Sequence, residues 1–350
     1  MNRSASWHER QRTIFLLASG VSTAGSFAGL TAKGWILMSG TDNAMLLALH
    51  FAALSLPTLI VSGPAGVRTD RIGCEQVLIQ AQWALLGAGL LGALSIPLLV
   101  GTAQVAVLLA STLLMGIASA YELTARNKYC ALLVDDPRTL APYLTSFSVV
   151  FNVGKLVGPP IGGWLVALTG PATALSLDAL TYLLPIASVI WLLKPNRSIE
   201  QLSSTSSSAT LNSAWRECGP VLRHVLKFTG LICMVGFFHP GLAPLIAADT
   251  LGPSPQDLGL FTSVLAAGSI TGGIILQRNS HKFSSRPGLT LGCFALITAI
   301  AQLGMASSRL IPVVLLMVWL IGAGTAGLLS SANLITQVGS QQVLRGRMAG

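Results

Sequence analysis

Long apolar segments separated by short polar connections predict that the chain crosses a membrane many times. A helix needs about 20 apolar residues to cross about 30 Å of hydrocarbon. Ten segments meet this requirement, at residues 13–38, 44–65, 76–100, 103–122, 145–168, 173–193, 228–248, 257–277, 288–306 and 311–336. They lack the alternating pattern of a β-barrel strand, so helices are the spanning structure that satisfies their backbone groups. We expect an all-α polytopic membrane protein.

The composition narrows the class of protein further. The 350-residue chain is 52% hydrophobic and 9% charged, whereas about 25% of the residues of a typical globular protein are charged. Its five cysteines have no short paired spacing, so they predict neither a disulfide framework nor a zinc site. A secreted disulfide scaffold, a coiled coil and a soluble nucleic-acid-binding protein are therefore excluded.

The net charge of +9 is explained by the orientation in the membrane. All but three of the 21 lysines and arginines fall in connections on one predicted side; the exceptions are Lys33 and Lys155 inside helices and Arg309 on the opposite side. Basic connections face the cytoplasm, so we place the N-terminus there and expect no nucleic-acid partner. The first segment is a retained helix and not a signal peptide, because nine more segments follow it.

The longest polar break, residues 194–227, separates six predicted helices from four. Its first part is serine-rich, as flexible linkers are. Its second part, from Trp215 to Lys227, has apolar residues at helical spacing and predicts a short helix on the inner membrane surface. We therefore expect an N-terminal six-helix bundle at 1–193, a cytoplasmic linker with a surface helix at 194–227, and a C-terminal bundle of four helices at 228–350.

A first motif, GVRTDRIG, occupies the short turn after the second segment, from Gly66 to Gly73. A glycine lets two helices approach closely, a carboxylate such as Asp70 can pair with a cationic group, and Arg71 can face anionic headgroups. The string resembles the signature loop between helices two and three of the major facilitator superfamily.

A second motif, GKLVGPPIGG, lies in the fifth segment. Its glycines, Gly154, Gly158, Gly162 and Gly163, recur about once per helical turn and make a face for close backbone packing, while Pro159 weakens the helix ladder. It resembles the fifth-helix motif of the superfamily's exporters, although Thr145 stands where that motif begins with another glycine.

Two further stretches, residues 123–136 and 344–350, resemble loops of the subgroup that contains siderophore and macrolide exporters. The resemblance implies the major facilitator fold, in which two six-helix bundles rock around a central cavity. If the halves are equivalent, six helices should follow the linker, whereas four precede Gly350. We expect either a fragment of a longer protein or a truncated gene product that lacks the last two helices.

The resemblance also implies a function. It predicts a monomeric secondary transporter of a bacterial inner membrane that exports a small amphiphilic drug or siderophore in exchange for a proton, without a cofactor. Asp70 and Arg71, with Gly66 and Gly73, would form the gate on the cytoplasmic side. The fourth helix lacks the mid-helix arginine of many proton-coupled drug exporters, because Arg126 falls at or beyond its predicted cytoplasmic end, and this leaves the coupling ion open.

Ionisable residues inside predicted helices are candidates for function, because a charge at the bilayer centre costs about 2.5–3.5 kcal/mol. Asp178 is interpreted as a proton or cation acceptor, or else as a packing carboxylate bonded to a hydroxyl. Lys155 would neutralise a carboxylate and help close the cytoplasmic side, or would extend to the inner interface. His239, beside the helix-breaking Pro240, is a candidate for substrate or proton binding, or a packing group. Lys33 is interpreted as extending to the outer interface.

Two other classes of protein are compared with the transporter. A membrane-embedded enzyme is disfavoured because the chain has no P-loop, HExxH or GxSxG motif and no paired intramembrane aspartates. A non-transporting membrane receptor or assembly protein on the same fold remains the alternative, since a fold does not dictate a function.

Overall fold

The computed structural model describes residues 3–41, 43–134, 137–192, 220–238, 241–278 and 287–339. Several predictions fall outside these ranges: the serine-rich linker, His239 with Pro240, and the 344–350 stretch. Within the ranges the elements are helical, and nine helices are long and apolar enough to cross a membrane. The predicted all-α polytopic architecture is confirmed.

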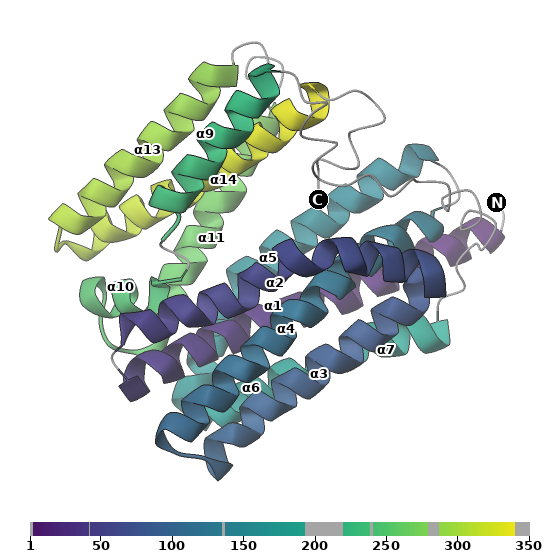
Figure 1. Cartoon of the computed structure of the whole chain (residues 1–350), viewed down its shortest axis with the longest axis horizontal. Helices are drawn as coiled ribbons and strands as arrows, with labels where there is room; N and C mark the ends of the chain where they lie inside the picture. Colours follow the sequence, from purple (N-terminus) through teal and green to yellow (C-terminus); the bar gives the residue numbers. More distant parts are fainter. Residues whose placement is uncertain are drawn as a thin grey trace. The chain divides into compact units, whose positions relative to one another are not determined.

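The first six spans come from the N-terminal part of the chain (Figure 1). They are α1 (Arg3–Thr41), α2 (Ala44–Ile72), α3 (Cys74–Leu98), α4 (Gly101–Leu132), α5 (Pro137–Thr169) and a sixth span formed by α6 (Pro171–Thr181), α7 (Leu183–Ala187) and the π-helical turn η1 (Ser188–Leu192). Continuous helix is expected because a bilayer offers no partner for an open backbone N–H or C=O group.

The chain divides into two compact units, Met1–Thr205 with Pro253–Leu260, and Ser206–Gly252 with Phe261–Gly350. In the first unit α1 packs against α5 and α6, while α4 packs against α2 and α3. A buried cluster around Phe15, Tyr129 and Tyr143 joins α1, α4 and α5. The first unit therefore has its own core and contains all of the candidate site described below.

The second unit contains α9 (Pro220–Gly236), α10 (Ala243–Thr250), most of α11 (Pro255–Arg278), α13 (Pro287–Ser307) and α14 (Ile311–Gly339). Helices α11 and α14 approach at glycines on both sides. A Cβ atom on Gly268 would overlap the carbonyl oxygen of Trp319, and one on Gly322 would overlap that of Leu265. The hydrophobic effect cannot hold helices together in lipid, so close backbone packing of this kind stabilises the contact between them.

The seventh segment was predicted at 228–248, with Pro240 as a helix-breaking residue, and the structure has two separate helices there. Helix α9 begins earlier, at Pro220, and ends at Gly236, and α10 begins only at Ala243. Residues 220–227 of the predicted surface helix belong to α9, which has Pro220 in its first turn, where proline is well suited, and residues 215–219 lie outside the described residues. The break follows from Pro240, which disfavours helical geometry in the residue before it and supplies no N–H group. The described chain therefore has nine candidate spans and not ten.

Candidate transport site

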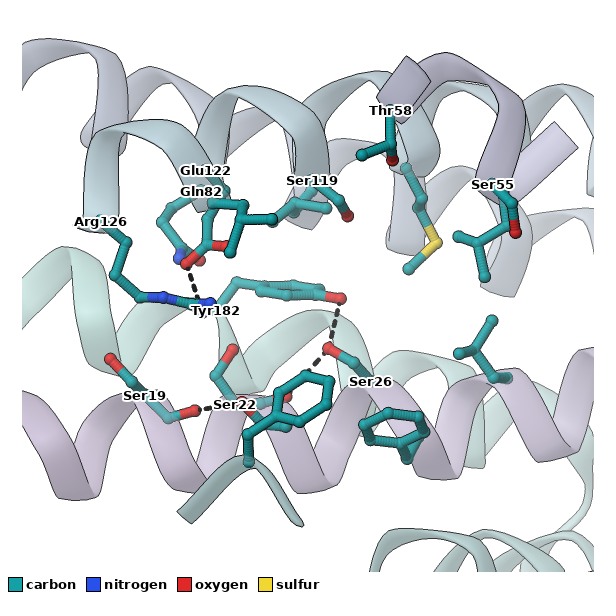
Figure 2. A pocket seen from close by; sticks show the side chains of 18 of the residues that line it. Ser19, Ser22, Ser26, Ser55, Thr58, Gln82, Ser119, Glu122, Arg126 and Tyr182 are labelled. Atoms are coloured by element: carbon teal, nitrogen blue, oxygen red, sulfur yellow. Dashed lines mark hydrogen bonds and ion pairs between the residues drawn. The ribbon is translucent and has the colours of Figure 1, made fainter. Parts of the chain in front are cut away.

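A cavity of about 610 Å³ opens among the helices of the first unit. Residues of α1, α2, α3, α4, α5 and the sixth span line it, and Figure 2 shows their side chains converging on a common space. This volume is within the range of about 300–1,000 Å³ that is typical of small-molecule sites.

One wall of the cavity is a row of hydroxyls on α1. Ser19, Ser22 and Ser26 lie one helical turn apart and Thr23 is beside them. The Ser26 hydroxyl donates to the Ser22 carbonyl oxygen at 3.0 Å, and the Thr23 hydroxyl donates to that of Ser19 at 2.8 Å. Since these two protons are used within the helix, the Thr23 and Ser26 hydroxyls offer mainly acceptor oxygens to a ligand.

Apolar side chains make up much of the remaining wall. They are Phe27 and Leu30 of α1, Leu54 and Leu59 of α2, Leu85 of α3, Met115 and Leu123 of α4, and Phe151 of α5. Two further hydroxyls, on Ser55 and Thr58, face the space from α2 (Figure 2). The cavity is therefore amphiphilic, with weakly polar and apolar surfaces on different helices.

A charged pair lies in the α4 wall. The Arg126 guanidinium donates to the Glu122 carboxylate at 3.0 Å, and their side chains are only 17% and 12% exposed. Arg126 also lies over the Phe147 ring, 5.9 Å from its centroid. Arg126 was expected at or beyond the end of the fourth helix, and this was wrong because α4 continues to Leu132. The spacing of Glu122 and Arg126, four residues on a helix, predicts this ion pair from the sequence, and the structure confirms it.

Tyr182 connects the sixth span with the α1 wall. Its hydroxyl lies 2.8 Å from the Ser26 hydroxyl, as Figure 2 shows. Either hydroxyl can donate the proton in this bond. Across the cavity, the buried Oε1 atom of Gln82 has no hydrogen-bond partner among the described residues. It is an acceptor that a ligand or water can satisfy.

Asp178 lies one turn before Tyr182 but is not among the residues that line the cavity. Its side chain is 2% exposed, and neither carboxylate oxygen has a hydrogen-bond partner in the described part of the chain. It occupies the space beside Gly29 of α1, where a Cβ atom would lie 2.7 Å from the Asp178 Cγ atom. The Tyr182 hydroxyl, one turn later on the same span, interacts with this carboxyl group without meeting strict hydrogen-bond geometry.

Lys33 does not extend to the outer interface as predicted. It is 1% exposed, and its amino group donates to the Ser111 hydroxyl at 2.9 Å and lies 3.1 Å from the Met115 sulfur, both on α4. Gly92 of α3 makes room for it, because a Cβ atom there would lie 3.3 Å from the Lys33 Cε atom. The sequence pattern missed this because the partners are distant in the chain.

Three other ionisable residues, Lys155, His239 and His50, lie in predicted spans. Lys155 is half-buried on α5, does not line the cavity and has no partner among the described side chains, so it is not brought to Asp178. His239 is outside the described residues. His50, a core residue in the sequence analysis, is buried with its Nδ1 atom 3.1 Å from the Thr112 hydroxyl.

The predicted gate motif lies at the junction of α2 and α3. The Asp70 carboxylate accepts from the Lys128 ammonium of α4 at 2.9 Å, whereas Arg71 is exposed. Gly73 has φ 90°, in the region that favours glycine, and forms the turn. Gly66 was expected to allow close helix packing, but a Cβ atom there would meet nothing within 4 Å. Its size is therefore not required by packing in the described structure.

The glycines of the fifth helix face two directions. Gly154, Gly158 and Gly162 lie against α1: a Cβ atom on Gly158 would be 2.5 Å from the Ala24 carbonyl oxygen, and one on Gly162 would be 2.7 Å from the Ala28 Cα atom. Gly163 lies instead against the backbone of Pro255, in the same compact unit, and the buried Pro159 lies next to Gly158 within a continuous α5. Three of the four glycines thus share one packing face.

Comparison with known proteins gives a consistent family. The transmembrane secretion effector family matches residues 6–349. The chain is 25% identical over 358 residues to the multidrug efflux pump Tap of Mycolicibacterium fortuitum, covering 96% of this chain and 84% of that protein. It is 23% identical over 350 residues to Tap of Mycobacterium tuberculosis, covering 96% and 81%.

Solved structures show the same fold. A bacterial homologue of the iron transporter ferroportin, in an inward-facing state, superposes with a TM-score of 0.72 at 17% identity, covering 97% of this chain and 86% of that one. A bacterial homologue of the lysosomal transporter Spinster superposes with a TM-score of 0.74 at 12% identity, covering 98% and 78%. With nine apolar spans and these matches, the chain belongs to the transmembrane secretion effector family of the major facilitator superfamily and is a multi-pass membrane transporter.

Proposed function

We propose that the protein is an exporter of small amphiphilic molecules of the drug or siderophore class, driven by proton antiport through alternating access. The observation that carries the proposal is the cavity of the first unit, with its α1 hydroxyls, its apolar side chains and a single ion pair between Glu122 and Arg126. Such a surface suits a ligand that is largely apolar and has a few polar groups. The related multidrug efflux pumps support the same direction of transport.

The coupling ion is proposed from the buried charges. Asp178 is an acidic group inside the membrane-spanning part with no hydrogen-bond partner among the described residues, and such groups mark ion and proton pathways. Tyr182 is one turn away on the same span and bonds to the cavity wall at Ser26. A proton bound at Asp178 would therefore be close to the substrate space without lying in it.

The setting follows from the distribution of basic residues. We infer a bacterial inner membrane with the N-terminus in the cytoplasm, because the basic connections lie on that side. The Asp70–Lys128 bond at 2.9 Å ties the end of α2 to α4. We place it at the cytoplasmic gate, where it would stabilise one of the two access states.

The test uses inverted membrane vesicles that contain the full-length protein and hold an inside-acid proton gradient. A panel of amphiphilic drugs and siderophores is added, and collapse of the gradient is followed with a pH-sensitive dye. Wild type should dissipate the gradient with at least one compound, and Asp178→Asn should not. Asp249→Asn is the matched control, because Asp249 is an exposed carboxylate paired with Arg309 at 3.8 Å. If labelled compounds accumulate without gradient collapse in wild type, the antiport is refuted while export stands.

A further inference from the structure

Two opposite charges are buried in the first unit without contacting each other. Lys33 of α1 is 1% exposed and Asp178 of the sixth span is 2% exposed. Helices α1 and α6 pack directly together, and the two charges interact electrostatically. Nevertheless the lysine is directed to Ser111 and Met115 of α4, and the carboxylate has no hydrogen-bond partner among the described residues.

This arrangement fits one protonation state of Asp178. Burying a carboxylate with no cation in contact is strongly unfavourable, whereas burying the neutral carboxylic acid costs much less. The lysine shows the opposite situation. Ser111 donates its proton to the Leu108 carbonyl oxygen at 2.8 Å and so accepts from the Lys33 amino group. Lys33 is thus satisfied by neutral groups and does not compensate a negative charge, as expected when Asp178 carries its proton.

A second position for the Lys33 side chain is available from the geometry of α1. Lys33 and Gly29 are four residues apart and share a helix face, and Asp178 fills the space beside Gly29. Long side chains in a helix extend over the turn on their N-terminal side. A rotation of the lysine toward that turn directs its amino group toward Asp178, and the end of the lysine side chain lies over Gly92, where there is no side chain to displace.

We propose that Lys33 changes partner with the protonation state of Asp178. With Asp178 protonated, Lys33 bonds to Ser111 and Met115; when the proton leaves to water in the cavity, Lys33 turns to the carboxylate and the pair becomes neutral. Because Met115 lines the cavity, the exchange links the proton to the α4 wall that contacts substrate. The proposal rests on the proposed function and adds the residue that couples proton to substrate.

Few charged groups act on Asp178 in the described part of the chain. Within the described structure, Lys33 of α1 acts on Asp178 through its charge and Tyr182 of the same span acts through its hydroxyl, while α3 and α5 contribute no such group. The Lys33 charge also acts on the buried His50 of α2. No second carboxylate near Asp178 in these ranges competes for the lysine.

The first test separates coupled from uncoupled transport in proteoliposomes of the full-length protein. Uphill accumulation requires the proton, whereas exchange of labelled for unlabelled substrate does not. In Lys33→Met, Asp178 lacks its cation and keeps its proton, so uphill accumulation should fall by about tenfold or more, while exchange stays within about twofold. Lys227→Met, on an exposed lysine of α9, is the control and should retain both.

The outcomes are distinct. Loss of uphill transport with retained exchange, in Lys33→Met and in the Lys33→Met/Asp178→Asn double variant, supports the switch. Retained uphill accumulation in Lys33→Met overturns it. Equal loss of both activities at normal protein levels also overturns it, because that is the behaviour of a lysine needed only for structure.

A second measurement does not depend on transport, so it remains valid if the proposed antiport fails. Infrared spectra of the purified protein are recorded from acid to alkaline pH, and the carbonyl band of the protonated Asp178 side chain is assigned by its loss in Asp178→Asn. In wild type the band should disappear as the pH rises. In Lys33→Met it should persist over the same range. Identical titration in the two proteins would overturn the proposed role of Lys33.

Discussion

Alanine substitutions at the α5 glycines that pack on α1 should lower stability, and most where the glycine lies closest to α1. Gly158 and Gly162 lie so close to α1 that a methyl group cannot be added without movement: the Cβ atom of an alanine at 158 would be 2.5 Å from the Ala24 carbonyl oxygen, and ordinary contact begins at 3.4 Å. The opposing atom is backbone, so the helices must separate by roughly 1 Å along the contact. Close packing is what holds helices together in lipid.

The magnitude follows from two opposing effects. Overpacking a close contact costs about 1–3 kcal/mol, while replacing glycine by alanine inside a helix gains about 1 kcal/mol. Gly87 of α3 supplies the matched control, because a Cβ atom there would meet nothing within 4 Å. Gly87→Ala should therefore be neutral or more stable. Gly158→Ala and Gly162→Ala should be less stable than Gly87→Ala by about 1–3 kcal/mol.

The assay is reversible unfolding of the purified variants in mixed detergent, followed by circular dichroism. Gly154→Ala belongs in the series as an intermediate case, since its nearest contacts would be 3.0 Å to Thr23 Cγ2 and 3.1 Å to the Ala24 backbone nitrogen. The expected order of stability is Gly87→Ala, then Gly154→Ala, then the other two. If all four variants unfold at the same detergent concentration, the α1–α5 contact does not limit stability and the reasoning is refuted.

Three other substitutions test single interactions. Asp70→Asn removes the 2.9 Å ion pair with Lys128. Because the pair is exposed, the free energy of unfolding should change by less than about 1 kcal/mol, but efflux at equal membrane levels should be abolished. Unchanged efflux would remove the gate assignment. Thr112→Val leaves the buried His50 ring without its 3.1 Å partner and should lower the free energy of unfolding by about 1–3 kcal/mol, whereas an unchanged midpoint would indicate another partner. Tyr182→Phe removes a 2.8 Å bond to the α1 hydroxyl row and should destabilise by about 1 kcal/mol; a more stable variant would contradict that bond.

Local patterns were sufficient for the architecture and for the motifs. Spans were recognisable because apolar length is set by the thickness of the bilayer. The gate and fifth-helix motifs were recognisable as short strings, but their detailed contacts were not. Lys128 as the partner of Asp70, and the separate direction of Gly163, depend on neighbouring helices.

Hydropathy alone does not locate the ends of the helices. Arg126 was placed at the end of the fourth helix because polar residues begin at Glu122, yet α4 continues through both of them. Polar residues can remain in a spanning helix when they face a cavity and pair with each other, as these two do at 3.0 Å. The break after Gly236 has no signal in hydropathy, since apolar residues continue through it, and Pro240 was the residue that indicated it.

The amino-acid sequence by itself determined that the chain is helical and crosses the membrane repeatedly, because backbone groups in lipid must bond within their own segment. Only the tertiary structure decided which buried polar groups have partners. Lys33 meets Ser111 across 78 positions of the chain, while Asp178, on an adjacent helix, has no hydrogen-bond partner among the described residues. The physical reason is that side-chain pairing in a helix bundle depends on how helices far apart in sequence are rotated about their axes and shifted along them. The hydropathy of the sequence contains no information on either quantity.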